Sequence, residues 1–433
     1  MIFFKAMSIL GILADAIMMG ENVKLDIDFV REQFPQSNED YVYCSNAGGS
    51  FVARQVLEIL EDFNRYKRIQ PYSPFSPSRE GGELMDRARG LWADALNIKE
   101  DELTFGPSTS SNSYVMAQAI GQTLTKQDEI VVCQQDHEAN HGAWRRAGER
   151  SGATVREWRL LPETGLLDTA DLYELLNEKT RWVFFPHCSN LVGTTNPVRD
   201  IIEEIRNRCD AFVGVDGVAH VPHHVPDLKA LDCDLYLFSL YKVFGPHQGV
   251  LYVRSSVGDK LVAQSHHFLT REPTKRFNPA GPQHAEVAAC AGVLDYFRSF
   301  MAHHNIVEHD SFNYALQEVR RLFAIHEKKL ATPILEFLHQ SSKVQLLGKP
   351  HCEDGDRAPT IAFRPLKQAS EQVTRKMNML GIGAEHGDFY AGRVLKGMSI
   401  DPSDGVVRIS LVHYNTEDEV NTIVAGLDQT LAG

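Results

Sequence analysis

Short apolar runs alternate with amphipathic stretches between about residues 100 and 255 of the chain. The apolar runs predict strands, and the stretches between them predict helices. The predicted strands are Leu103–Phe105, Glu129–Cys133, Arg181–Phe185, Ala211–Val215, Leu235–Ser239 and Gly249–Val253. The predicted helices are Ser111–Leu124, His141–Gly152, Thr169–Glu178 and Arg199–Asn207. Because such alternation is typical of a mainly parallel sheet covered on both faces, we expect a large α/β domain here.

The pattern changes after about residue 285, where a long helical stretch begins. It predicts helix from Ala285 to Gln340 with breaks near His303 and at Pro333. The elements predicted after it are the strands Val344–Leu347 and Pro359–Arg364, a helix ending near Leu380, the strand Val406–Val412, and a last helix that opens at Thr416 with Glu419 as a capping box. This order predicts a smaller α+β domain. Three prolines between Tyr66 and Arg79 predict a surface loop.

A chain of 433 residues is long enough for two or three packed units. We divide it into an N-terminal extension (1–22), a segment associated with the small domain (23–45), a large domain (46–300) and a small domain (301–433). The apolar run Met1–Met19 contains Lys5 and Asp15 and has no Ala-x-Ala cleavage pattern. We therefore expect an upstream extension rather than a signal peptide or a membrane span.

Composition narrows the range of partners and compartments. The formal net charge is −13, from 57 acidic and 44 basic residues, which repels nucleic acid and anionic membrane surfaces. The seven cysteines are scattered and form no Cys-x-x-Cys pair. This use of cysteine predicts a reducing, cytoplasmic location.

The strongest chemical signal is Lys242, which follows the predicted strand Leu235–Ser239 and precedes Gly245-Pro246. Ligands of open α/β sheets bind at the carboxyl ends of strands. A lysine amine that is desolvated there has a lowered pKa, as Schiff-base chemistry requires. A surface lysine in an ordinary turn is the alternative.

Three other strand ends carry polar residues. Asp216 directly follows the strand Ala211–Val215, and a carboxylate at that depth needs a cationic or N–H partner. His137 could stack on a planar ring, and Asn190 could bind a ring hydroxyl or a substrate carboxylate. A surface histidine and a turn-forming asparagine are the alternatives.

Two further segments could bind anions. Ser108, Thr109 and Ser110 follow a strand and open a helix, where hydroxyl and backbone N–H groups form an anion site or simply cap the helix. Arg408 lies on the strand Val406–Val412. Its planar guanidinium could bind a carboxylate, and a surface arginine on an exposed strand face is the alternative. The chain has no Gly-x-x-x-x-Gly-Lys-Ser/Thr or Gly-x-Gly-x-x-Gly pattern for nucleotides.

A metal site is not expected. His220, His223 and His224 lie close together, but a proline interrupts their spacing and no cysteine or paired acid completes a ligand set. A lysine, an acid for a ring nitrogen, a stacking histidine, an anion site and an arginine together fit pyridoxal 5'-phosphate (PLP) with an amino acid.

On these residues the sequence resembles the class V aminotransferase family, in its cysteine desulfurase-like branch, over about Phe34 to Leu431. The resemblance is carried by the strand-end residues above and by Asn190-Leu191-Val192-Gly193-Thr194, Asp216-Gly217, Ser239-Leu240-Tyr241-Lys242 and Tyr414-Asn415-Thr416-Glu417. It implies the PLP-dependent transferase fold type I, with a mainly parallel seven-stranded sheet in a large α/β domain and a small α+β C-terminal domain. It also implies a homodimer with active sites at the interface.

The resemblance implies a role for each of these residues. Lys242 would form the Schiff base and move protons at the substrate Cα, and Asp216 would keep the pyridine nitrogen protonated. His137 would stack on the ring. The phosphate group would be held by Ser108, Thr109, Ser110, Ser239 and Tyr241. Arg408 would bind the substrate carboxylate, with Asn190 beside it.

The chain departs from the family pattern at several positions, which leave the cofactor site recognisable but not the substrate side. Where desulfurases carry their persulfide cysteine, this chain reads Gly387-Asp388-Phe389-Tyr390-Ala391, so Tyr390 is expected among the substrate-binding residues. The other family residues that differ are an arginine replaced by Glu385, a glutamine by Ala219, a histidine by Tyr241 and a threonine by Pro282.

The function predicted from these residues is chemistry at the Cα of a small amino acid. Cysteine desulfurase-like C–S lyase chemistry without a persulfide and aminotransferase chemistry both fit, and epimerisation is an alternative. They share their first steps, and the outcome depends on which Cα bond stands perpendicular to the cofactor ring. A non-catalytic binding or scaffold protein of the same fold is the competing class, suggested by the substitutions at Glu385 and Tyr390.

Overall fold

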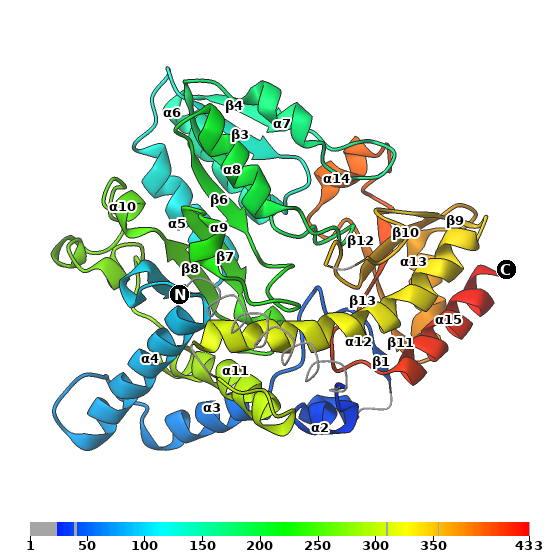
Figure 1. Cartoon of the computed structure of the whole chain (residues 1–433), viewed down its shortest axis with the longest axis horizontal. Helices are drawn as coiled ribbons and strands as arrows, with labels where there is room; N and C mark the ends of the chain where they lie inside the picture. Colours follow the sequence, from blue (N-terminus) through cyan, green and yellow to red (C-terminus); the bar gives the residue numbers. More distant parts are fainter. Residues whose placement is uncertain (1–23, 39–40, 309–310, 354, 433) are drawn as a thin grey trace, which may run out of the picture.

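The computed structural model describes residues 24–38, 41–308, 311–353 and 355–432, and the predicted extension 1–22 lies outside them. A seven-stranded sheet with helices on both faces forms the larger part of the molecule, and a four-stranded sheet with its own helices lies beside it (Figure 1). The large sheet has the order β2-β8-β7-β6-β5-β3-β4. Its strands are β2 (Leu103–Gly106), β3 (Glu129–Cys133), β4 (Thr154–Trp158), β5 (Thr180–Pro186), β6 (Phe212–Asp216), β7 (Leu235–Ser239) and β8 (Gly249–Val253).

The prediction of a mainly parallel sheet is confirmed. Strand β8 is antiparallel to its neighbours β2 and β7, and the other neighbouring pairs are parallel. Strand β4 was not predicted. It lies at the edge of the sheet and pairs with β3 alone, and its Arg156 and Glu157 break the apolar pattern because an edge strand is half exposed.

Alternate residues of the central strands face two separate hydrophobic clusters. In β3, Ile130 and Val132 pack under helices α5 (Thr109–Gly121) and α6 (Glu138–Ser151), while Val131 and Cys133 face the opposite side. The opposite cluster is covered by α3 (Arg54–Tyr66), α4 (Ser76–Ala95), α7 (Thr169–Leu175), α8 (Val198–Arg208), α9 (Leu228–Leu231) and α11 (His284–His303). Burial on both faces explains why the central strands read as continuous apolar runs.

The smaller sheet is antiparallel and has the order β12-β13-β10-β9. Its strands are β9 (Val344–Leu346), β10 (Thr360–Pro365), β12 (Glu385–Gly387) and β13 (Val406–Ser410), and the helices with it are α13 (Ser370–Met379), α14 (Gly392–Gly397) and α15 (Glu417–Leu431). Strand β1 (Val42–Tyr43) pairs with β11 (Ile382–Gly383), so residues just after 41 lie against the C-terminal part. The domain limits given above stay a prediction.

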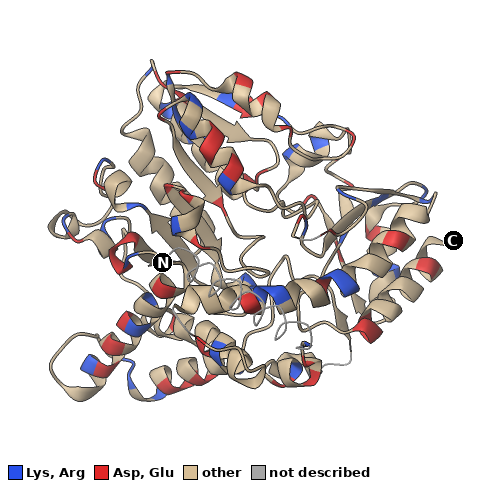
Figure 2. Cartoon of the chain, viewed as in Figure 1, with Lys and Arg blue, Asp and Glu red and all other residues tan. Residues whose placement is uncertain are grey.

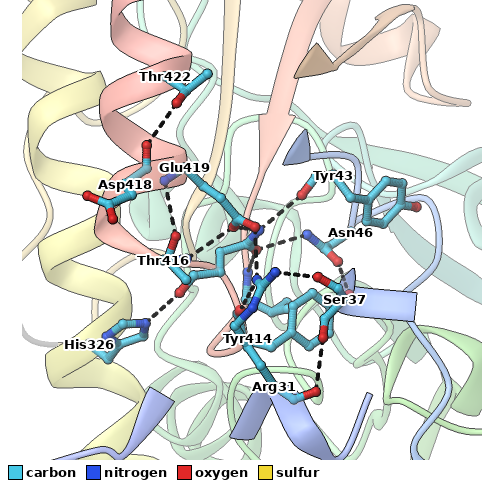
Figure 3. Close-up of polar contacts among 12 residues, drawn as sticks. Arg31, Ser37, Tyr43, Asn46, His326, Tyr414, Thr416, Asp418, Glu419 and Thr422 are labelled. Atoms are coloured by element: carbon cyan, nitrogen blue, oxygen red, sulfur yellow. Dashed lines mark hydrogen bonds and ion pairs between the residues drawn. The ribbon is translucent and has the colours of Figure 1, made fainter. Parts of the chain in front are cut away.

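A polar network ties the N-terminal segment to the start of α15 (Figure 3). Arg31, from α2 (Ile27–Glu32), forms an ion pair with Glu419 at 2.9 Å and donates to the carbonyl of Tyr414 at 3.2 Å. Thr416 and Glu419 form the predicted capping box at the start of α15. These contacts fix the motif Tyr414–Glu417 where the two parts of the chain meet.

Helix α12 (Phe312–Gln340) reaches from the large sheet to the small one (Figure 1). The predicted break near His303 is confirmed, because α11 ends there. The predicted break at Pro333 is wrong, because α12 continues through it. Pro333 lies on an exposed face of the helix, where water can satisfy the Lys329 carbonyl that loses its N–H donor.

The predicted loop between Tyr66 and Arg79 is partly wrong, because α4 already begins at Ser76. Pro77 occupies the first turn of that helix, where its missing N–H has no intrahelical partner to lose. Acidic and basic side chains are interspersed on the helices, while the strands of the large sheet are mostly free of charge (Figure 2). Within the described ranges, no helix is long and apolar enough to cross a membrane.

Candidate active site

All nine residues predicted to bind the cofactor line one pocket at the carboxyl ends of β5, β6 and β7. They are Ser108, Thr109, Ser110, His137, Asn190, Asp216, Ser239, Tyr241 and Lys242. Parallel strands bring their carboxyl ends to the same edge of the sheet, which places residues more than a hundred positions apart around one space.

Lys242 ends the short 3₁₀ helix η3 (Leu240–Lys242) that directly follows β7. Its side chain is only 8% exposed and opens on the pocket. Among the described residues its amine has no hydrogen-bond or ion-pair partner. Burial and the positive charge of Arg408 lower the pKa of the Lys242 amine to about 8, although Asp216 acts in the opposite direction. At pH 7 about a tenth of this amine is therefore neutral and nucleophilic, far more than for an ordinary lysine.

Asp216 ends β6 and is held on several sides. It accepts hydrogen bonds from the Asn140 side chain and from the backbone N–H of Val218 at 2.8 Å, and the carboxyl group of Asp136 lies close enough for the two acids to shift each other's pKa. Burial raises the pKa of both carboxyl groups, and the charge of Asp216 raises the pKa of Asp136 further. Of the two groups, Asp136 is therefore the more easily protonated, and Asp216 is the one that keeps the negative charge.

His137 forms the N-cap of α6, where its Nδ1 accepts a hydrogen bond from the Ala139 N–H at 3.0 Å. Burial, with the charges of Lys242 and Arg408, lowers the pKa of His137 to about 3. The ring is thus neutral, and His137 lines the pocket. The Tyr390 ring lies 5.2 Å from it, centroid to centroid, at an angle of 34°.

We call the start of helix α5 the anion cradle, because its hydroxyl and free backbone N–H groups suit an anion. Ser108 is its N-cap, and Thr109 and Ser239 share a hydrogen bond between their hydroxyl groups at 2.7 Å. The backbone N–H groups of Thr109 and Ser110 have no acceptor in the part of the chain that the structure describes. A Cβ at Gly249 of β8 would lie 2.4 Å from the carbonyl carbon of Ser108, so only glycine lets the cradle approach the sheet this closely.

Arg408 and Asn190 lie together where the small sheet meets the pocket. The Arg408 guanidinium donates to the Asn190 carbonyl at 3.0 Å, and the Asn190 amide donates to the Phe389 carbonyl at 2.9 Å. The Phe389 ring covers the guanidinium, with 3.8 Å from Cζ to the ring centroid. Burial lowers the pKa of Arg408 to about 10, so it remains a cation at neutral pH.

Both residues keep unused polar atoms. The Nε of Arg408 and the Oδ1 of Asn190 are buried without a partner among the residues that the structure covers. Unsatisfied buried groups at a pocket are typical of a ligand site. Arg408 itself lies behind Asn190 and Phe389 rather than in the pocket wall.

Tyr390 lies at the outer edge of the site. Its side chain is 72% exposed and, with Glu385 and Phe389, lines a neighbouring open cavity of about 890 Å³. Phe389 and Tyr390 both have left-handed backbones, with φ of 51° and 57°. The carbonyl of Tyr390 accepts a hydrogen bond from the Glu138 N–H at 2.8 Å, which fixes this strained turn next to His137.

Three residues of the site were missed by reasoning from the sequence. Asp136 and Asn140 hold Asp216, and Cys188 lines the pocket next to Asn190. Asp136 and Asn140 flank His137 at the start of α6, and a polar run at a strand-to-helix turn is the signal that could have found them. Burial raises the pKa of Cys188 to about 12, so it is no ready nucleophile.

The three clustered histidines are paired with protein groups. His220 lies 3.2 Å from His224, and His223 lies 3.0 Å from Glu327. Outside the masked positions, no group of three or more His, Cys, Asp or Glu side chains is arranged to hold a metal ion.

The residues present fit PLP in their chemistry. The unpaired amine of Lys242 suits the aldehyde, the cradle at α5 suits the phosphate group, Asp216 suits a protonated ring nitrogen, and the neutral face of His137 suits a planar ring. The unsatisfied atoms of Arg408 and Asn190 suit the carboxylate of an amino acid.

Comparison with known proteins agrees with this chemistry. The family model of the class V aminotransferases matches residues 42–423. The chain is 30% identical over 411 residues to Aminotransferase-like protein FGM3 of Gibberella zeae, covering 94% of this chain and 98% of that protein. It is also 30% identical to Cysteine desulfurase-like protein ustD of Aspergillus flavus, with 94% of this chain and 91% of that protein covered.

Solved structures share the fold. The cysteine desulfurase of Thermococcus onnurineus superposes with a TM-score of 0.81 at 22% identity, covering 94% of this chain and 98% of that one. The cysteine desulfurase CsdA of Escherichia coli gives a TM-score of 0.79 at 22% identity and the same coverage. The predicted fold class is therefore confirmed, and the chain belongs to the class V aminotransferases, a family of PLP-dependent enzymes of fold type I.

Proposed function

We propose that this chain acts at the Cα of a small amino acid and that Lys242 holds the cofactor in a Schiff base. The observation that carries the proposal is the buried, unpaired amine of Lys242, which shares a pocket with Asp216 and the anion cradle. When bound, PLP supplies an electron sink for the bonds at the substrate Cα.

The residues around the pocket hold the ring proton, transfer the Cα proton and bind the substrate. Asp216, held by Asp136 and Asn140, stabilises a proton on the ring nitrogen. Lys242, with its lowered pKa, accepts a proton from Cα and returns it. Arg408 and Asn190 bind the substrate carboxylate and so orient the bonds at Cα.

The reaction proceeds without a persulfide. Cys188 is the cysteine that lines the pocket, and its pKa is raised to about 12 by burial. The turn after β12 carries Phe389 and Tyr390. C–S lyase or aminotransferase chemistry therefore fits the site, and relatives with desulfurase-like and aminotransferase-like names support the same two reactions.

We further propose a homodimer in a reducing, cytoplasmic compartment. The seven cysteines are all free in the structure, which agrees with a reducing environment. The family resemblance supports the dimer.

Amino acids supplied to the PLP-loaded protein in D₂O test the proposed chemistry. We expect deuterium at Cα, with sulfide, ammonia and a 2-oxoacid from cysteine if the reaction is lyase-type, or amino transfer to an added 2-oxoacid if it is transamination. Inverted stereochemistry would indicate an epimerase. If PLP is bound but no amino acid exchanges its Cα proton, the protein is a binding module and the proposal is wrong. Lys242→Ala is the inactive control.

A further inference from the structure

A second pocket lies directly behind the candidate active site. It has a volume of about 600 Å³ and is lined by residues of α8, α9 and α12 and by residues that follow β5 and β6. Pro186 and Cys188 line the active-site pocket, whereas His187 between them lines the second one. In the same way, Ala219 lines the active-site pocket, and the next residue, His220, lines the second pocket. A single layer of backbone thus separates the two spaces.

A chain of aromatic and polar groups forms one wall of this second pocket. The rings of His187 and His220 stack with centroids 3.5 Å apart. The Nδ1 of His187 lies 2.8 Å from the Tyr236 hydroxyl, and the Nε2 of His220 lies 3.2 Å from the Nδ1 of His224. The Nε2 of His224 lies 3.1 Å from the side-chain oxygen of Gln317.

These contacts fix where the protons are. Burial lowers the pKa of His187 and His220, and lowers the pKa of His224 to about 3, so the three rings are neutral at neutral pH. The Gln317 oxygen accepts from His224, His224 in turn accepts from His220, and the Nδ1 of His220 is left as an acceptor. The Tyr236 hydroxyl is a stronger donor than imidazole, so His187 keeps its proton on Nε2.

Both of these remaining ring atoms lack a partner. His187 and His220 are each only 6% exposed, and both line the pocket. Within the described ranges, neither the Nε2 of His187 nor the Nδ1 of His220 has a hydrogen bond to the protein. The pocket wall therefore carries one N–H donor and one acceptor without a protein partner, each on a largely buried ring, and the two rings are stacked.

Arg320 of α12 adds a positive charge. It lines the pocket and lies close enough to lower the pKa of all three histidines. As far as the described residues show, it has no hydrogen bond or ion pair. Asp227 is already bound by the Asn97 side chain at 3.0 Å and the Ala230 N–H at 2.8 Å, and Asp200 lies on the exposed first turn of α8.

We propose that this pocket binds an oxyanion that also carries a hydroxyl group, such as hydrogen phosphate or a hydroxycarboxylate. Arg320 supplies the opposite charge, His187 donates to the anion, and His220 accepts from its hydroxyl group. The site is separate from the one that holds the cofactor, so it can be filled while PLP is bound.

Calorimetric titration of the PLP-loaded protein tests this proposal, because the cofactor then fills the cradle at α5. The probes are inorganic phosphate, lactate and acetate. We expect saturable binding of phosphate or lactate at one site per chain, and weaker binding of acetate, which has no hydroxyl group for His220. Phosphate alone would identify a phosphate ligand, and lactate alone a hydroxycarboxylate.

Two arginine variants show whether the anion binds in this pocket. Arg320→Gln should weaken binding at least about tenfold. Arg321→Gln is the matched control, because this neighbouring arginine pairs with Glu318 at 2.9 Å and does not line the pocket. Arg320→Lys keeps the charge and should bind with intermediate affinity, which gives a second measurement if Arg320→Gln does not fold.

The proposal is overturned if the wild-type protein binds none of the probes saturably. It is also overturned if Arg320→Gln and Arg320→Lys bind phosphate and lactate as tightly as Arg321→Gln does. Because binding is measured with PLP in place, a negative result would leave the proposed Lys242 chemistry unaffected.

Discussion

The lowered pKa of Lys242 follows from its place at the end of β7. Desolvation disfavours the ammonium form, and the positive charge of Arg408 acts in the same direction, so the pKa falls from 10.5 to about 8. Asp216 offsets part of this shift and keeps a negative charge in the same pocket. Lys242 and Asp216 thus share one pocket, and the described residues show no direct ion pair between them. This arrangement agrees with the proposed roles as a nucleophilic amine and a partner for a ring nitrogen.

The rate at which the cofactor-free protein takes up PLP should follow the neutral fraction of Lys242. A lysine with a lowered pKa is charged below that pKa and neutral above it, so the rate should rise about tenfold per pH unit up to about pH 8 and then level off. Stopped-flow absorbance measures it, and free Nα-acetyl-lysine is the control. A rate that keeps rising beyond pH 10 would show that the amine is not perturbed.

Arg408→Ala should raise the KM for amino acids at least about tenfold and change kcat less, because a charge-assisted hydrogen bond to the substrate carboxylate is lost. Steady-state kinetics measure both constants. Arg364→Ala, on the adjacent strand β10, is the matched control and should leave KM unchanged. An unchanged KM in Arg408→Ala would mean that another group binds the carboxylate.

Site residues that directly follow a strand can be predicted from the sequence more easily than residues that hold those site residues in place. Lys242 and Asp216 each come after an apolar run, and parallel strands bring such positions together. Asn140 reaches Asp216 from the start of α6 across 76 positions of sequence, a contact that no local pattern encodes. The same limit applies to Phe389, whose stacking on Arg408 depends on a left-handed turn.

At the scale of elements, the anion cradle depends on how closely α5 approaches β8. Gly249→Ala would place a Cβ 2.4 to 2.7 Å from backbone atoms of Ser108 and Thr109, which must then move away. We expect a loss of about 1–3 kcal/mol in stability and weaker PLP binding. Thermal denaturation and PLP titration measure these effects.

Gly281→Ala is the control for this change, because nothing among the described atoms lies within 4 Å of the added Cβ. It should change neither stability nor PLP affinity. If Gly249→Ala and Gly281→Ala had the same stability and PLP affinity, the cradle would have space for a Cβ at position 249, and the prediction would be wrong.

The elements that sequence patterns predict best are those buried on both faces. Strands β3 and β7 have the residues predicted for them, because their apolar runs are continuous. Edge strand β4 was not predicted, because a strand exposed to solvent on one side can contain charged residues. The continuation of α12 through Pro333 was not predicted either, because a proline on the exposed side of a helix need not end it.

At the scale of the whole molecule, two parts of the chain build one site. The large sheet supplies Lys242, Asp216 and the cradle to the pocket, and the small sheet places Arg408 of β13 against Asn190 of the pocket wall. The network of Arg31, Tyr414 and Glu419 holds the N-terminal segment where these parts meet (Figure 3). A substrate that bridges Arg408 and the cofactor pocket would therefore contact both parts.

The proposed homodimer is a prediction at this scale. Light scattering of the purified protein should give twice the chain mass of 48.6 kDa, and the value should not fall on dilution. A mass of one chain at all concentrations would contradict the dimer and the sharing of active sites between subunits.

Borohydride reduction of the PLP-loaded protein, followed by peptide mass analysis, tests the central claim most directly. Reduction fixes PLP on whichever lysine holds it. We predict a pyridoxyl group on the peptide that contains Lys242 and none on that peptide in Lys242→Ala. A loaded protein with no adduct at Lys242, or with the adduct on another lysine, would contradict the account.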